Sequence, residues 1–283
     1  MRISVSRWTR FFLGAAALSL VSLPVLAQFP DDIPDNVKLR IGGIFASFQN
    51  NVTVSNPNAP GTGIDLTGEH LTPDHKNTFR GDGYWNFLGR SYLDFGYVDF
   101  KLDGSTSITR DIVFNGKVYK AGAEVSGESR SRYIYAAYRY GIIKNPDLHW
   151  GVSLGLTYAT LSAKLAASAG VELPDGTVIS GGASSERSIN FPVPLIGTEI
   201  EFRLAQHLTL GARARAIGAT IDPYSGSWIE YAGNLNWYVS EHFGVGGAYE
   251  YQKIHLKKDE SAPNAFSFDQ RYDGPRLYLL VTF

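Results

Sequence analysis

The last eight residues of the chain, RLYLLVTF (276–283), decide the class of fold. Leu277, Leu279, Val281 and Phe283 lie on one face of an extended strand, because successive side chains of a strand point to opposite sides. The residues between them, which include an arginine and a threonine, lie on the other face. A period of two therefore predicts a β-strand here, with an apolar environment on one side.

The same period recurs along most of the chain. Apolar residues occupy alternate positions in four further stretches, with small, polar or charged residues between them. These stretches are 79–87, 150–158, 208–216 and 229–237. Strands in soluble sheets average about 5–6 residues. These runs approach the 9–11 residues that a tilted strand needs to cross a bilayer. We therefore expect lipid on the apolar side and a polar lumen on the other.

Connections between the runs alternate between tight and loose, as they do in outer-membrane barrels. The expected strands cover residues 37–48, 77–88, 91–113, 118–142, 148–164, 187–203, 207–221, 226–239, 242–256 and 268–283. The sequence thus predicts an all-β fold, a closed antiparallel transmembrane β-barrel of about ten strands. Eight or twelve strands are the alternatives, if one weak segment is miscounted.

The N-terminus has the pattern of an export signal. Arg2, Arg7 and Arg10 precede an apolar segment, residues 11–20, and Val25-Leu26-Ala27 provides small residues for cleavage after Ala27. The apolar segment is too short for a comfortable transmembrane helix. We expect a signal peptide at 1–27, a periplasmic tail at 28–36 and an outer-membrane barrel at 37–283.

Composition narrows the possible functions. The chain has no cysteine, so neither disulfides nor thiolate metal sites are available. Its net charge is −1, which argues against nucleic-acid binding. No phosphate-binding or dinucleotide-binding motif occurs, and no cofactor is expected. A mean hydropathy of −0.12 with 13% aromatic residues fits strands that have one apolar and one polar face.

Residues 91–125 carry two further predictions. Leu93 and Tyr97 share a face, but the apolar face continues at Phe100 and Leu102, so the phase changes. We expect a β-bulge near Val98, since otherwise charged residues would meet lipid. Beyond it, residues 108–114 and 118–125 are expected to form a hairpin standing above the membrane, joined at the two-residue turn Asn115-Gly116.

Charged residues on the lumen side form the main candidate site. A barrel of about ten strands is too narrow for a porin-like channel, so side chains must fill it. Both signs occur in similar number, which favours a structural network of paired charges over a path for small solutes. The set comprises Arg80, Asp82, Asp94, Arg139, Glu199, Glu201, Arg203, Arg213, Arg215, Glu230, Glu250 and Arg276. Glu199 and Glu201, beside three of these arginines, leave a local binding site conceivable.

Several short segments resemble a group of uncharacterised proteobacterial outer-membrane β-barrel proteins, namely residues 79–84, 93–97, 109–112 and 272–278. The C-terminal Leu277, Leu279, Val281 and Phe283 resemble the signal by which such barrels are recognised for assembly. The resemblance implies a location in the outer membrane. Its implied partners are membrane lipid, lipopolysaccharide and, during biogenesis, the barrel-assembly machinery. The oligomeric state stays open, and the resemblance adds no mechanism.

Catalysis is not expected, although one alternative stays open: a hydrolase at the extracellular rim, acting on lipid A or peptides. Its acids and bases would come from the loop residues His70, Asp74, His75, His255, Asp259 and Glu260. The first loop offers one Asp–His pair, Asp74 and His75, and the last loop offers another, His255 and Asp259. The two pairs could approach each other, because the first and last strands of a closed barrel are neighbours. A metal site at His70 and His75 is not expected, since their spacing lies in a loop without fixed geometry.

Overall fold

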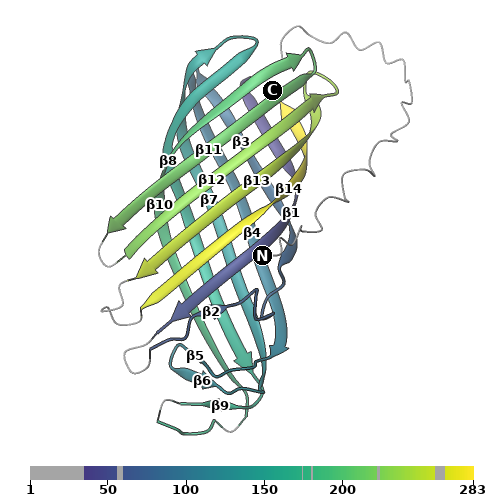
Figure 1. The fold of residues 1–283 in the computed structure, drawn as a ribbon. Coiled ribbons are helices and arrows are strands. Elements are labelled where there is room, and N and C mark those ends of the chain that lie inside the picture. Colours follow the sequence, from purple (N-terminus) through teal and green to yellow (C-terminus); the bar gives the residue numbers. More distant parts are fainter. Residues whose placement is uncertain (1–34, 56–59, 174, 180, 222–223, 259–264) are drawn as a thin grey trace, which may run out of the picture.

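The computed structural model describes residues 35–55, 60–173, 175–179, 181–221, 224–258 and 265–283. The predicted signal peptide and most of the predicted tail lie outside them. Within these residues, ten long strands pair antiparallel with their neighbours in chain order, and the last pairs with the first (Figure 1). They are β1 (Val37–Val54), β3 (His75–Leu88), β4 (Ser91–Ser107), β7 (Glu124–Lys144), β8 (Leu148–Ala167), β10 (Ala183–Ala205), β11 (Leu208–Ile221), β12 (Tyr224–Tyr238), β13 (Phe243–Lys258) and β14 (Phe266–Thr282). The predicted closed barrel of ten strands is confirmed.

The two ends of the barrel differ. At one, which we call the terminal end, the backbone N–H of Val37 donates to the carbonyl of Phe283 at 2.9 Å. The tight connections between β3 and β4, β7 and β8, β10 and β11, and β12 and β13 lie at this end. The longer connections lie at the opposite, loop end, where the short strands are labelled in Figure 1. The predicted alternation of tight and loose connections is therefore present. Among the described residues, no helix has the length and apolar character needed to span a bilayer.

An apolar belt surrounds the terminal half of the barrel. On β8, the outward side chains Trp150, Val152, Leu154, Leu156 and Tyr158 are all exposed. Comparable exposed rows lie on the other long strands, for example Leu235 and Trp237 on β12. A continuous outward belt of this kind is what a bilayer would cover.

The polarity of the wall inverts toward the loop end. On β4, Leu93 points outward and Asp94 inward, but farther along Phe100 and Leu102 are fully buried while Lys101 is exposed. The register of β4 with β7 runs unbroken from Ser91 to Ser107. The predicted β-bulge near Val98 is therefore wrong. The change of pattern arises because the strand leaves the belt: beyond it the outer face is polar, and the interior is an apolar core.

A small cap packs into the loop end of the barrel. β5 (Ile112–Phe114) and β6 (Lys117–Tyr119) form a hairpin, and β6 also pairs with β9 (Val171–Glu172). Asn115 and Gly116 have φ values of 49° and 76°, so the predicted two-residue turn is confirmed. The hairpin is shorter than the expected 108–114 and 118–125, and it does not continue β4 and β7. β4 and β7 end at Ser107 and Glu124, and the apolar side chains Ile112, Phe114 and Tyr119 are fully buried against the core. The short β2 (Ile64–Asp65) pairs with β1 beside this cap.

Candidate functional site: the charged lumen and its two ends

The lumen inside the belt contains a network of buried ion pairs centred on Asp82 of β3. The Asp82 side chain is fully buried and accepts a hydrogen bond from Arg40 Nε at 2.7 Å. Arg276 also donates to it directly. Arg213 and Arg80 lie 3.7 and 3.8 Å away. One carboxylate therefore pairs with arginines from three other strands, β1, β11 and β14, and with Arg80 of its own strand.

Two glutamates complete the network from the other side of the barrel. Glu230 contacts Arg213 at 2.8 Å and Arg80 at 3.2 Å. Glu250 contacts Arg80 at 2.8 Å and Arg276 at 3.2 Å. Arg213 and Arg276 each contact two of these carboxylates and Arg80 contacts all three, so the network links β3, β11, β12, β13 and β14 across the interior.

The remaining predicted charges form smaller groups. Arg139 Nε lies 3.0 Å from both carboxylate oxygens of Asp94, and its guanidinium stacks over Tyr92 with 4.3 Å to the ring centroid. Arg215 lies 4.0 Å from Glu230 and stacks over the ring of Tyr135.

Three predicted residues are less enclosed than the rest. Glu199 lies 3.9 Å from Arg40, Glu201 binds Lys38 at 2.8 Å, and Arg203 lines a pocket at the terminal end. Glu201 and Arg203 therefore share this pocket, whereas Glu199 is not among its lining residues and faces Arg40. Sequence reasoning missed Lys38 and Arg40, which are both buried. Their signal was available, since both alternate with the outward Leu39 and Ile41 at the start of β1.

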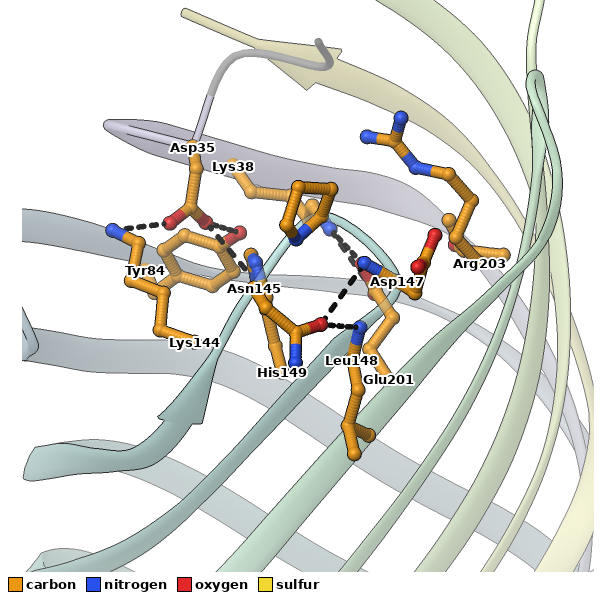
Figure 2. Close-up of a pocket in the computed structure, with 12 residues that line it drawn as sticks. Asp35, Lys38, Tyr84, Lys144, Asn145, Asp147, Leu148, His149, Glu201 and Arg203 are labelled. Carbon is orange, nitrogen blue, oxygen red and sulfur yellow. Dashed lines mark hydrogen bonds and ion pairs between the residues drawn. The ribbon is translucent and has the colours of Figure 1, made fainter.

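A polar pocket of about 350 Å³ opens at the terminal end, beside Asp35 at the start of the described residues (Figure 2). Asp35 accepts hydrogen bonds there from Tyr84 at 2.6 Å and Tyr92 at 2.8 Å, and Lys144 lies 2.8 Å away. Burial acts to raise the pKa of Asp35, but the hydrogen bonds from Lys144 and Tyr84 outweigh it and leave this pKa below its ordinary value. Asp35 thus ties the tail to three strands as a carboxylate.

We expect this contact to make stability sensitive to acid. A carboxyl whose pKa is lowered in the folded state stabilises it above the unfolded pKa of about 3.9, and that stability is lost as the pH falls through the folded pKa. Asp35→Asn should lower the urea unfolding midpoint at pH 7. Below pH 4 the midpoints of wild type and variant should lie closer together, because Asp35 of the wild type becomes protonated. Urea unfolding from pH 7 to pH 3 measures both. The same change at the exposed Asp147, on a turn that lines the same pocket, is the control.

At the loop end, two of the three candidate histidines, His75 and His255, each pair with an aspartate. His75 Nδ1 lies 2.9 Å from Asp74, and both side chains are about 70% exposed. His255 Nδ1 lies 2.5 Å from Asp269, a residue that sequence reasoning did not select. Its expected partners Asp259 and Glu260 lie outside the described residues. His75 stands opposite Ser47 of β1, whereas Asp269 stands opposite Asn51, and no contact in the described ranges joins the two pairs. His70, on the first loop, has a φ of 58°. Across all the residues that the structure describes, no cluster of three metal-ligating side chains occurs.

Comparisons with known proteins identify the fold. No family model matches the chain, and no curated protein matches it. Among solved structures, the outer membrane protease OmpT from Escherichia coli aligns over 88% of this chain and 97% of that one, with a TM-score of 0.54 and 13% identity. OprG from Pseudomonas aeruginosa (TM-score 0.39, 9% identity, 89% and 98% coverage) and Ail from Yersinia pestis (0.31, 11%, 87% and 99%) are more distant. The fold is that of bacterial outer-membrane β-barrel proteins.

Proposed function

We propose that the protein is an integral outer-membrane β-barrel whose lumen is sealed, and that it acts through its surfaces as a structural or ligand-interacting protein. The observation that carries this proposal is the ion-pair network around Asp82. Its arginines and carboxylates are nearly inaccessible to solvent, with side-chain exposures of 0–7%. A conducting path at this level would have to break several charge-assisted hydrogen bonds.

Export and membrane insertion belong to the same proposal. The N-terminal pattern ending at Ala27 supports export, and the exposed apolar belt supports insertion. Leu277, Leu279 and Phe283 are exposed on the outward face of β14, where assembly machinery and then lipid could contact them. On this arrangement the terminal end faces the periplasm and the loop end faces lipopolysaccharide.

The sealed lumen predicts no conductance. Purified barrel inserted into planar bilayers should give no current steps in 1 M KCl, because charged side chains fill the section that ions would cross. Folding is verified separately, by the heat-dependent shift in gel mobility that folded barrels show, and insertion by flotation of the protein with lipid vesicles. Regular ohmic steps from inserted wild-type protein would contradict the sealed lumen and favour a solute path instead.

A further inference from the structure

The wall of the barrel loses its pairing between β10 and β11 toward the loop end. The register of these two strands ends at Ile196 and Ala216, although β10 stays paired with β8 as far as Ala183. Pro192 and Pro194 lie in the separated part of β10, and proline has no N–H to donate to a neighbouring strand. Because the ladder with β8 is unbroken past both prolines, the missing donors fall on the β11 side. In Figure 1 the loop-end tips of β11 and β12 project from the left edge of the barrel.

An apolar cavity of about 320 Å³ lies on the inner side of this gap. Phe191 and Val193 of β10 and Ile217 of β11 line it, and all three side chains pack against the buried core. Trp228 of β12 also lines it and packs edge-on against Tyr133 of β7, with 4.9 Å between the ring centroids. This aromatic pair closes the cavity toward the opposite wall of the barrel.

The cavity extends through the gap to the outer surface. Residues 190–194 of β10 all line it, although side chains of consecutive strand residues point to opposite sides. Phe191 and Val193 face the core, whereas Asn190 and Pro192 are exposed on the outer face. A cavity lined from both faces of one strand crosses the plane of the sheet. Its opening between β10 and β11 is called the mouth below.

The mouth adjoins the apolar belt. On β8, Leu156 and Tyr158 stand opposite Pro194 and Pro192, and both β8 side chains are at least half exposed. Ile196, at the last pair before the gap, is 59% exposed and borders the mouth on its terminal side. Lipid that covers these apolar side chains therefore covers the mouth as well.

The charged network closes the cavity toward the terminal end. Ile217 and Trp228 stand opposite each other, and two residues farther toward that end Arg215 stands opposite Glu230. Arg215 and Glu230 are both 3% exposed, and neither lines the cavity. An apolar group cannot enter a layer of paired charges without breaking their contacts. The cavity is therefore a pocket with one entrance and not a path through the barrel.

The chemistry of the cavity suits an apolar chain. The polar residues among its lining face outward, at the mouth: Asn190, Ser225, Ser227 and His255. The inner part therefore offers water few partners, and an empty apolar cavity forfeits dispersion contacts. Its volume is at the lower end of the range for small-molecule sites, about 300–1,000 Å³, which is room for one chain and not for a whole two-chain lipid.

We infer that the gap between β10 and β11 admits one acyl chain of an amphiphile from the surrounding bilayer into this cavity, while the headgroup stays at the membrane surface. The chain enters sideways through the wall, because the mouth opens where lipid contacts the barrel. This inference rests on the proposed insertion into the outer membrane. It does not rest on the absence of conductance, since the cavity ends at the charged network.

The test uses the folded mature barrel reconstituted into phosphatidylcholine vesicles. A small fraction of the lipid carries a photoreactive diazirine near the methyl end of one chain. After illumination, peptide mass spectrometry should find label inside the cavity, on Phe191, Val193 or Trp228, as well as on the belt residues Trp150 or Leu154. The belt residues are the internal reference, because lipid contacts them whether or not a chain enters the cavity.

Filling the cavity should remove the interior label alone. Val193→Trp should lower labelling of Phe191 and Trp228 about tenfold or more, because several methylene groups lose their site. Ile217→Trp fills the cavity from the other side of the gap and should do the same. Leu204→Trp is the matched control, since it adds the same side chain at a 56% exposed, outward position of β10 and should keep the interior label. Gel mobility before and after heating checks that each variant is folded.

The wild-type label is decisive by itself. Label on the belt with none on Phe191, Val193 or Trp228 would overturn the inference, as would an interior label unchanged in both folded cavity-filling variants. Interior labelling by a free fatty acid with the same diazirine, but not by the phospholipid, would overturn the bilayer lipid as the source of the chain. Flotation of the protein with the vesicles measures insertion separately, so failure of membrane insertion is distinguished from a cavity that takes no chain.

Discussion

Asp82→Asn will destabilise the folded barrel by about 3–5 kcal/mol, the cost typical of removing one partner from a buried ion pair. The amide keeps the shape of the carboxylate but removes the negative charge that Arg40, Arg276 and Arg213 share. These guanidiniums are nearly inaccessible to water, so solvent cannot replace the lost partner. Urea titration of the refolded protein, followed by the heat-dependent gel shift and by tryptophan fluorescence, measures the loss.

An exposed carboxylate provides the matched control. Asp103 lies 3.7 Å from Lys76, but its side chain is 62% exposed, and surface pairs contribute about 0–1 kcal/mol. Asp103→Asn should therefore leave the midpoint close to wild type. If Asp82→Asn shifted the midpoint no more than Asp103→Asn does, the lumen network would not stabilise the barrel. The double variant Asp82→Asn/Arg276→Met should cost less than the sum of the single variants, since the two side chains are in direct contact.

The strands were predictable because the alternation of apolar and polar residues locates them by itself. In Trp150 to Tyr158, every second side chain is large and apolar, and the structure places that whole face outward. The β-bulge predicted at Val98 is absent for a related cause. The environment is not the same along the entire strand, because β4 passes from the belt into a region with an apolar core and a polar exterior. A strand longer than the belt is thick carries both patterns, and the reversal marks where it leaves the belt.

The charged residues of the lumen could be selected from the sequence, but their partners could not. Arg80 and Glu230 are 150 residues apart, and Lys38 and Glu201 are 163 apart. Which of them meet depends on the tilt and stagger of the closed sheet, which alternation does not encode. The same limit hid the pair formed by His255 and Asp269. These two residues become neighbours only when the register of β13 with β14 is known.

Gly42→Ala will prevent close approach at the seam that closes the barrel, and we expect a loss of about 3 kcal/mol, at the upper end of the usual cost of overpacking. Gly42 of β1 stands opposite Tyr278 of β14. A Cβ at this position would lie 2.0 Å from the carbonyl oxygen of Leu277 and 2.5 Å from the Cα of Tyr278. Both obstacles are backbone atoms, so a side-chain rotation cannot relieve the clash, and the two strands must move apart.

The adjacent glycine separates this steric effect from the general cost of changing glycine in a strand. A Cβ on Gly43 meets only the carbonyl oxygen of Thr78, at 4.0 Å, so Gly43→Ala should keep the wild-type midpoint or raise it slightly. The pair is compared by urea midpoint and by the yield of heat-modifiable barrel on refolding. Equal behaviour of the two variants would mean that β1 and β14 tolerate separation at Gly42. Because this seam is the last pairing needed for closure, a selective loss at Gly42 would show that the stability of the whole barrel depends on how closely its first and last strands approach.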